Sequence, residues 1–396
     1  MSVDTLEQSK QLNFELSEDQ QMIRDAVRDF TERHVAPTVI ERDASKKFPH
    51  DLIELLAEQN LLGIYHDEEY GGAGFDTVSF CLAIEEIARW DASLALTVAS
   101  HTSLCSGHIA LAGTHEQKLK FLAPLAKGEK LGAWCLTEPG SGSDASGMKS
   151  TAVKDGDHWI INGTKTFITQ GSVGHTYLVL AKTDPDKGTK GISAFVIERE
   201  MEGVKPGPPM HKLGMNSSDT TEVVFENVKV PAENMIGDEG MGFIDTMKVL
   251  DGGRIGIGAL SVGIARGALE ESVKYSQERK QFGKPIGNFQ AIEHKLVDMA
   301  TEIDAARLLV HRAAWLKDQG KPYVMAASKA KLFASELSVR ASLDAVQIHG
   351  GYGYTKEYHV ERFLRDSKLM TIGEGTSEVQ RMIIGRELKK EFGYSY

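Results

Sequence analysis

Cysteine is scarce in this chain, and the few residues present do not follow a metal-binding pattern. The three cysteines, Cys81, Cys105 and Cys135, are an odd number without metal-type spacing, so we expect reduced thiols, as in cytosolic proteins. No apolar run reaches the roughly 18 residues needed to cross a bilayer. The region near Met1 lacks the basic, apolar and small-residue succession of a signal peptide. These absences predict a soluble intracellular protein without a metal site.

Positively charged residues are fewer than negatively charged ones. The chain contains 45 Lys and Arg against 56 Asp and Glu, which gives a formal net charge of −11. This acidity argues against nucleic acid or an anionic membrane surface as the main partner. The length of 396 residues exceeds what one simple core accommodates and suggests two or three domains.

The hydrophobic pattern changes twice along the chain. Residues 1–127 show helical periodicity, residues 128–240 show short runs typical of strands, and residues 241–396 return to helical periodicity. We therefore predict an α+β, mostly helical protein with an N-terminal α-helical domain, a middle β domain and a C-terminal four-helix bundle. The β domain is expected to be a small β-barrel or a two-sheet structure. The bundle helices are expected near 242–278, 288–318, 322–348 and 376–391.

Local signals place individual elements within these domains. Ser17-Glu18-Asp19-Gln20 is a capping box that begins a helix. Residues 159–161, Asn162-Gly163 and residues 164–168 indicate a strand, a two-residue hairpin turn and a second strand. Further strands are expected at 177–182, 192–197 and 221–225.

Residues 92–111 form a helical stretch that is unusually rich in Ala, Ser, Thr and Gly. Small side chains let helices pack closely, which is the simpler explanation. They also leave room for a ligand chain, for which Ala99, Ser100 and Ser103 are the candidate positions. Gly252 and Gly253 raise a similar question, because each costs about 1 kcal/mol against alanine inside a helix, which points to close approach of a partner or ligand.

One carboxylate stands out near the C-terminus. Glu374 lies between Gly373 and Gly375, whose lack of a side chain permits unusual backbone angles and close approach of a ligand. Thr376 or Ser377 is expected to cap the helix that follows. A carboxylate beside a helix start is placed to act as a base over a bound ligand, although most isolated glutamates of this kind are solvated loop residues.

Three further stretches have the composition of ligand-binding segments. Cys135–Asp144 offers backbone N–H groups and hydroxyls to a polar ring edge or a pyrophosphate, but it lacks the glycine spacing and following helix of a dinucleotide fingerprint, and its composition equally fits an ordinary loop. Arg279 and Lys280 end a helix, where either the helix dipole or a phosphate would favour them. Gly350 suits a helix C-cap after His349, which we expect to be a packed residue.

Together these stretches resemble the acyl-CoA dehydrogenase family, and the resemblance extends from about Phe14 to about Phe392. Two family signatures carry it. The first is Cys135–Gly147, which reads C-L-T-E-P-G-S-G-S-D-A-S-G, and the second is Gln347–Asp366 with its cluster of glycines. The resemblance implies the acyl-CoA dehydrogenase fold and makes Glu374 the match to the family's catalytic base.

The resemblance also implies FAD bound between the β domain and the C-terminal bundle. The positions that match the family's FAD contacts are Trp134, Leu136, Thr137, Gly142, Ser143, Phe167, Thr169, Arg279, Phe282, Gln290, Gln347, Gly350, Gly351, Thr376 and Glu378. Those that match its acyl-CoA contacts are Ser143, Asp251, Arg254 and Gly375. Some of the family's FAD contacts cross a subunit interface, so the resemblance implies at least a dimer and usually a homotetramer.

The reaction that the resemblance implies is the α,β-dehydrogenation of an acyl-CoA to the trans-2-enoyl-CoA, as in fatty acid β-oxidation. Glu374 would take the pro-R proton from Cα while a hydride leaves Cβ for flavin N5. The glutamate's backbone N–H and a ribityl hydroxyl would stabilise the charge on the thioester oxygen. Burial should raise the pKa of Glu374 toward working pH. An electron-transferring flavoprotein would then accept the electrons, in the bacterial cytoplasm or, in a eukaryote, the mitochondrial matrix.

The resemblance leaves the acyl group open. Gly253 stands where the isovaleryl-CoA dehydrogenase branch carries its base, so the retained Glu374 favours a straight, short- to medium-chain substrate. Gly373 stands where many fatty-acyl members have an aromatic residue, so a branched, cyclic or aromatic acyl group is the alternative. An acyl-CoA oxidase and an inactive acyl-CoA-binding relative are further alternatives. The chain end at Tyr396 counts against the first, and Glu374 against the second.

Overall fold

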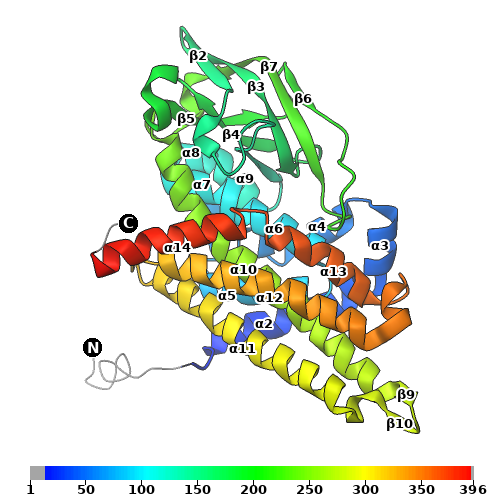
Figure 1. The fold of residues 1–396 in the computed structure, drawn as a ribbon. Coiled ribbons are helices and arrows are strands. Elements are labelled where there is room, and N and C mark those ends of the chain that lie inside the picture. Colours follow the sequence, from blue (N-terminus) through cyan, green and yellow to red (C-terminus); the bar gives the residue numbers. More distant parts are fainter. Residues whose placement is uncertain (1–13, 394–396) are drawn as a thin grey trace.

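The computed structural model describes residues 14–393 of the chain (Figure 1). The stretch near Met1, in which we expect no signal peptide, lies outside the described residues, as do the outermost ends of the first and last predicted domains. Figure 1 shows the β domain above a body of helices. The confirmed architecture is therefore mostly helical, with helical, β and helical parts in chain order.

The N-terminal part is helical, as predicted. Its helices are α2 (Glu18–Phe30), α3 (Val39–Ser45), α4 (His50–Glu58), α5 (Thr77–Ala88), α6 (Ala92–Ala99), α7 (Gly107–Ala112), α8 (His115–Gln117) and α9 (Ala123–Ala126). The capping box is confirmed: the Ser17 hydroxyl accepts the Gln20 N–H at 3.2 Å, and the Ser17 N–H donates to Gln20 Oε1 at 3.0 Å.

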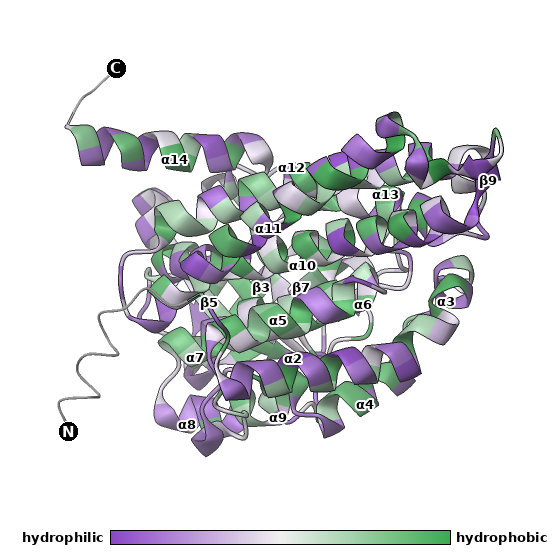
Figure 2. Cartoon of the chain, turned by 90° about the horizontal axis from the view of Figure 1, so that it is seen from below, coloured by the Kyte–Doolittle hydropathy of each residue, from purple (hydrophilic) through white to green (hydrophobic). Residues whose placement is uncertain are grey.

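Helix α5 is buried along its whole length, between α2 and the C-terminal helix α10 (Gly242–Glu278) (Figure 2). Residues 92–106 of the small-residue stretch that follows are also buried, and a π-helical segment, Ser100–Ser106, joins α6 to α7. Close packing is thus one confirmed role of these small side chains. Close packing is compatible with the alternative, room for a ligand chain, because Ser103 also lines a cavity.

The β domain consists of two layers. The strands are β1 (Gly132–Cys135), β2 (Thr151–Asp155), β3 (His158–Thr169), β4 (Thr176–Lys182), β5 (Ile192–Glu198), β6 (Val204–Pro206), β7 (Thr220–Pro231) and β8 (Met235–Ile236). Strands β6, β7, β3 and β2 form one layer and β1, β4, β5 and β8 the other, linked by a bridge between Thr151 and Lys182. Aromatic side chains from both layers fill the space between them. The ring centroids of Trp159 and Phe195, for example, are 5.6 Å apart.

The predicted hairpin turn at Asn162-Gly163 is wrong. Strand β3 runs through these residues, and they form an irregularity in its pairing with β7. Glycine is needed at 163 because a Cβ there would lie 2.1 Å from Ser150 Oγ. The two-residue turn lies earlier, at Gly156-Asp157, between paired residues of β2 and β3. The glycine of the Asn-Gly pair therefore reflects the close approach of the segment at Ser150, and not a turn.

The C-terminal part contains the four predicted long helices, α10, α11 (Gln290–Asp318), α12 (Val324–His349) and α14 (Ser377–Phe392). A further helix, α13 (His359–Met370), was not predicted; it packs against α10 and α12. A small hairpin of β9 (Lys280–Gln281) and β10 (Lys284–Pro285) projects from the end of α10 (Figure 1). The predicted packing of His349 is confirmed, since its ring stacks on Tyr275 with centroids 4.2 Å apart.

None of the helices within residues 14–393 is both long and apolar enough to cross a membrane. No group of three or more His, Cys, Asp and Glu side chains in the same range is arranged to hold a metal ion. The three cysteines are buried thiols that form no disulfide.

Candidate active site

The loop that carries Glu374 joins α13 to α14 and is fixed by its backbone. Glu374 has φ +51° and Gly375 has φ +93°, a left-handed conformation that is costly for a glutamate. The Gly375 carbonyl accepts hydrogen bonds from Lys331 Nζ at 2.8 Å and from Gln380 Nε2 at 3.0 Å. Thr376 caps α14, which confirms one of the two predicted caps. The strained glutamate is therefore held in place by interactions that leave its carboxylate free.

The Glu374 carboxylate is set in a buried, charged environment. Its Oε2 is shielded from solvent and has no hydrogen-bond partner among the described residues. Burial raises the pKa of Glu374 to about 7, although the Lys331 and Arg254 cations oppose this rise. Burial likewise lowers the pKa of Lys331 to about 8. A carboxylate with an unused oxygen and a pKa near neutrality has the properties of a general base.

Asp251 and Arg254 lie on α10 beside this carboxylate. Arg254 is 4% exposed and forms an ion pair with Asp251 one helical turn away. Burial raises the pKa of Asp251 and lowers that of Arg254, and each partner's charge opposes the shift of the other. Removing either partner would leave a buried charge unpaired. Asp251 thus holds the Arg254 cation close to Glu374.

Gly253 explains why the glutamate fits against α10. A Cβ at residue 253 would lie 2.3 Å from Glu374 Oε2 and 2.9 Å from Leu104 Cδ2. Even a methyl group would therefore displace the carboxylate. The close approach that the sequence suggested at Gly252-Gly253 is present, and the approaching group is a side chain of the same protein.

The residues predicted to contact the flavin gather at the end of β1 and on the adjoining part of β3. Trp134 and Leu136 end or follow β1, and the Thr137 carbonyl accepts the Thr166 N–H at 2.9 Å, next to Phe167. Phe167 has φ +56° and is 68% exposed. The remaining members of this group, Gly142, Ser143 and Thr169, lie on the loop after β1 or at the end of β3.

The residues of this group fit a flat ring with polar edges. An exposed aromatic ring at Phe167, held in a costly backbone conformation, offers a face for stacking. Thr137 and Thr169 supply hydroxyls and backbone groups beside it. Nothing lies within 4 Å of a Cβ placed on Gly142, so the loop leaves open space for a bound group.

Sequence reasoning missed the ion pair that holds this loop. Glu138 is 6% exposed and accepts the backbone N–H groups of Lys149 and Ser150 at 2.6 and 3.0 Å. Its carboxylate also accepts from Lys165 Nζ, 2.8 Å away on β3. Glu138 lies within the first signature. Its partner Lys165 lies on a strand, where side chains alternate between the two faces, and the sequence does not show that this lysine points inward. Lys331 was missed as well, since a lone lysine in a helix usually faces solvent.

The other predicted FAD residues lie at the opposite end of α10. Arg279 caps that helix and its guanidinium is 5.6 Å from the Tyr352 ring centroid, beside Gly350 and Gly351. Phe282 is 93% exposed on the β9–β10 hairpin. The predicted contacts Gln290 and Gln347 are also exposed, at the start of α11 and the end of α12.

The Arg279 group lies far from the residues around Glu374 within a single chain. Arg279 follows Arg254 by 25 residues on α10. At a rise of about 1.5 Å per residue this separation is roughly 37 Å. Thr376 and Glu378, by contrast, start α14 next to Glu374. The structure thus brings Thr376, Glu378, Gly375, Asp251 and Arg254 together around Glu374, and leaves the Arg279 group apart.

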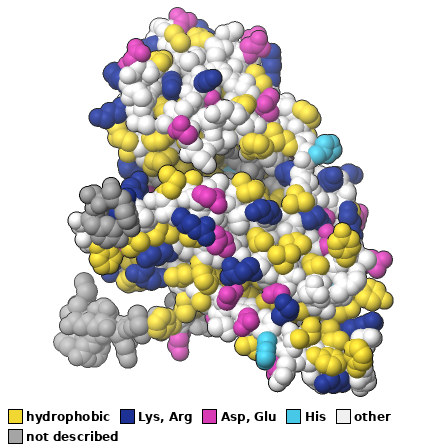
Figure 3. All heavy atoms as spheres, in the orientation of Figure 1, with side chains coloured by type: hydrophobic (Ala, Val, Ile, Leu, Met, Phe, Trp, Pro, Cys, Tyr) yellow, Lys and Arg dark blue, Asp and Glu magenta, His cyan; other side chains and the backbone are white. Residues whose placement is uncertain are grey.

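The surface between the β domain and the helices is hollowed. Figure 3 shows this depression below the β domain, with hydrophobic side chains at its edge. A concave surface at a junction of domains is a common location for ligand sites.

Comparison with known proteins agrees with this arrangement. Residues 17–129, 133–228 and 240–389 match the N-terminal, middle and C-terminal domains of acyl-CoA dehydrogenases. A short-chain-specific acyl-CoA dehydrogenase of Clostridium acetobutylicum is 47% identical over 95% of this chain and 100% of its own. Subunit CarC of the caffeyl-CoA reductase-Etf complex of Acetobacterium woodii is 46% identical over 95% and 99%.

Solved structures give the same result. Butyryl-CoA dehydrogenase from Megasphaera elsdenii superposes with a TM-score of 0.94 at 47% identity, covering 95% of this chain and 100% of that one. A glutaryl-CoA dehydrogenase from Mycobacterium smegmatis in complex with FADH2 gives 0.90 at 32% identity, covering 95% of each chain. The chain therefore belongs to the acyl-CoA dehydrogenase family.

Proposed function

We propose that this chain oxidises the Cα–Cβ bond of a short- to medium-chain acyl-CoA to the trans-2-enoyl-CoA, with FAD as cofactor and Glu374 as base. The observation that carries the proposal is the Glu374 carboxylate, buried beside Arg254 and Lys331 with one oxygen unbonded. The short-chain preference rests on likeness to the Clostridium acetobutylicum and Megasphaera elsdenii enzymes.

The reaction requires removal of a weakly acidic proton next to a thioester carbonyl. A base works best when its pKa is near the operating pH, and burial brings Glu374 to about 7. The backbone N–H of Glu374 has no partner among the described residues. It is therefore free to donate to the thioester oxygen as negative charge develops there. The same residue would then supply both the base and one stabilising donor.

The residues around β1 and β3 would hold the flavin ring. Phe167 would stack on it, and Thr137, Thr169 and the open loop at Gly142 would meet its polar edges. When bound, FAD supplies the hydride acceptor that no protein side chain can provide. The chain's own contribution is to exclude water, to position the thioester and to hold the proton on Glu374.

The separation of the two FAD groups supports assembly of at least a dimer. Arg279 and the exposed Phe282 lie at the other end of α10 from Arg254, roughly 37 Å along the helix, so a cofactor beside Glu374 is out of their reach within one chain. We propose that they contact FAD of a second copy, and that the assembly is a homotetramer.

Arg279→Ala should therefore weaken FAD retention, by about tenfold for the loss of one charge-assisted phosphate contact. The released FAD would be measured by fluorescence after dialysis. Lys274→Ala is the matched control, since Lys274 is an exposed cation on the same helix. Unchanged FAD content in the Arg279 variant would remove this contact from the proposal.

The proposed electron acceptor is an electron-transferring flavoprotein, and the proposed location is the cytoplasm. The first proposal rests on the Etf complex to which the CarC relative belongs, and the second on the bacterial sources of the relatives. Reduced enzyme reoxidised by a purified flavoprotein and not by oxygen would agree with a dehydrogenase. Rapid reoxidation by oxygen alone would favour the oxidase alternative.

An aromatic acyl group is the second candidate substrate, and Gly373 favours it. The three atoms nearest to a Cβ at residue 373 all belong to Leu369, at 3.6 to 3.9 Å, so packing does not demand glycine there. The absent side chain leaves space beside Glu374 that an aromatic residue would fill. The similarity to a caffeyl-CoA reductase subunit points in the same direction.

The proposal is tested by mixing purified enzyme anaerobically with butyryl-CoA and an arylpropionyl-CoA and following flavin absorbance. Bleaching by butyryl-CoA is the expected result, and faster bleaching by the aryl thioester would favour the second candidate. A protein that binds FAD but is bleached by no acyl-CoA would refute the proposed function.

Lys331→Met should shift the pH dependence of the reaction. The Lys331 cation lowers the pKa of Glu374, so its removal raises that pKa further. The acidic limb of kcat/KM should lie near pH 7 in the wild type and move to higher pH, by about one unit, in the variant. Lys329→Met, an exposed position on the same helix, is the control. An unshifted limb would show that Lys331 does not tune the base.

A further inference from the structure

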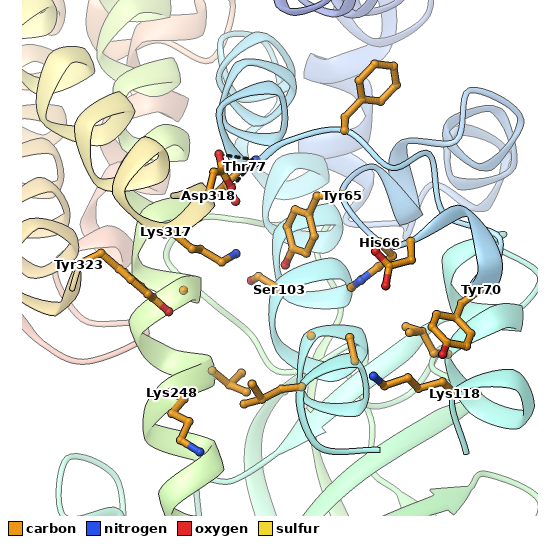
Figure 4. A pocket seen from close by; sticks show the side chains of 18 residues that line it. Tyr65, His66, Tyr70, Thr77, Ser103, Lys118, Lys248, Lys317, Asp318 and Tyr323 are labelled. Carbon is orange, nitrogen blue, oxygen red and sulfur yellow. Dashed lines mark hydrogen bonds between the residues drawn. The ribbon is translucent and has the colours of Figure 1, made fainter. Parts of the chain in front are cut away.

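A cavity of about 390 Å³ lies beside the proposed base (Figure 4). Its wall comprises the segment before α5, the face of α7 and its preceding turn, the N-terminal part of α10 and the junction of α11 with α12. Figure 4 shows the polar ends of Lys317, Tyr65 and Ser103 directed toward one another, with His66 facing them from another side. The cavity is large enough for part of an acyl chain.

The cavity adjoins the Glu374 carboxylate. Ser103 and Gly252 line it, and a Cβ on the neighbouring Gly253 would lie 2.3 Å from Glu374 Oε2 and 2.9 Å from Leu104 Cδ2, the residue after Ser103. Burial raises the pKa of Tyr65, and the negative charge of Glu374 raises it further. Tyr65 is therefore close to Glu374. A group attached to a thioester at Glu374 therefore has this cavity within reach.

Lys317 brings an unpaired positive charge to the cavity. Its Nζ stands 4.5 Å from the Tyr65 ring centroid, and a Cβ at Gly252 would lie 3.7 Å from it. Among the described residues, this nitrogen has no hydrogen bond and no ion pair. The neighbouring Asp318 is occupied, because both its oxygens accept the Thr77 N–H at 3.1 and 3.0 Å. Burial lowers the pKa of Lys317, which the Asp318 charge opposes.

His66 adds a second unsatisfied polar group. The residue is 3% exposed, and its Nε2 has no hydrogen-bond partner in the described part of the chain. Burial lowers its pKa to about 3, so the ring is neutral at physiological pH and can donate or accept a hydrogen bond. Tyr323, whose hydroxyl would be 4.0 Å from a Cβ at Gly252, supplies a further donor. Buried polar groups without partners are costly, and a ligand that pairs with them removes the cost.

We propose that this cavity binds a carboxylate at the distal end of the acyl group, so that the substrate is a monothioester of a dicarboxylic acid. This inference rests on the proposed function and specifies its substrate class. An alkyl end would bury Lys317 and His66 without partners, whereas a carboxylate accepts hydrogen bonds from both. The other lysines of the wall are Lys118 and Lys248, of which Lys248 is paired with Asp245 at 2.9 Å, and Asp67 adds a carboxylate, so the cation available to the ligand is that of Lys317.

The test compares CoA thioesters of equal carbon number that end in a methyl group or in a carboxylate, across a series of lengths. The measurement is kcat/KM from flavin bleaching coupled to an artificial acceptor. Wild-type enzyme should prefer the carboxylate series at one length, roughly ten- to a hundredfold, as expected for one charge-assisted hydrogen bond. Lys317→Met should abolish that preference, mainly by raising KM for the carboxylate series.

Lys321→Met is the matched control. Lys321 also lies over an aromatic ring, at 4.4 Å from the Trp315 centroid, but it does not line the cavity. This variant should keep the preference. Equal activity of the wild type toward both series would overturn the inference. So would an equal loss toward both series in the Lys317 variant, which would assign the lysine to the phosphates of CoA. Butyryl-CoA separates the two proposals, because its turnover supports the proposed function whatever the carboxylate series shows.

Discussion

Glu374→Gln should retain bound FAD and acyl-CoA but lose flavin bleaching by substrate, by roughly 10²- to 10⁴-fold, the usual contribution of a general base. The amide has the shape of the carboxyl group, and Oε2 has no hydrogen bond that the change would break. The glutamine amide, however, cannot accept the proton that leaves Cα. Stopped-flow absorbance with butyryl-CoA measures the rate, and the FAD content of the purified variant is measured alongside it.

Glu391→Gln provides the matched control for this substitution. Glu391 is exposed near the end of α14, on the helix that Glu374 precedes. The flavin of the Glu391→Gln variant should be bleached by butyryl-CoA at the wild-type rate. A Glu374 variant that bound FAD normally and still bleached at that rate would exclude Glu374 as the base and with it the proposed mechanism.

Much of the fold was predictable because its elements are long and carry clear periodicity. The four long C-terminal helices and the capping box at Ser17 were found from residue spacing alone. The helix cap at Thr376 was predictable for the same reason, since it depends on residues a few positions apart. The role of Glu374 stays a prediction that rests on family signatures and on the geometry described above.

The contacts that hold the helical parts together were not predictable. Glu85 on α5 pairs with Arg266 on α10 at 3.2 Å and with Arg307 on α11 at 2.9 Å. Both arginines are more than a hundred positions away from Glu85 in the chain, and each of the three appears in the sequence as an ordinary charged residue. One buried apolar cluster likewise includes residues of both the N-terminal and C-terminal helices. Periodicity shows which face of a helix is apolar, but it does not show which helix covers that face.

The site shows the same limit. The sequence identified Glu374 and the glycines around it, because glycine marks unusual backbone geometry. It did not identify Lys331, which reaches the Gly375 carbonyl from another helix, or Lys317, whose charge lies in the cavity beside the base. Both lysines are recognisable only when the surroundings of their amino groups are known, since an inward-facing lysine looks like any other in a helical pattern.

Gly253→Ala should separate activity from stability. Alanine is the better helix former by about 1 kcal/mol, so the substitution favours the helix itself. Its methyl group would lie 2.3 Å from Glu374 Oε2 and 2.9 Å from Leu104 Cδ2, which are the ends of movable side chains. The fold can therefore accommodate the change by displacing them. A misplacement of about 1 Å at a catalytic group costs on the order of 10²-fold in rate.

The expected result is a bleaching rate about 10² lower than that of the wild type, with thermal midpoint and FAD content little changed. Gly385→Ala is the control, because it replaces a glycine within α14 where a Cβ meets nothing within 4 Å. It should leave the rate unaltered. If the Gly253 variant reacted as fast as the wild type, the position of Glu374 against α10 would not matter for proton removal. A variant that instead unfolded would indicate that Leu104 and the backbone around it cannot move, which the positions of the contacted atoms argue against.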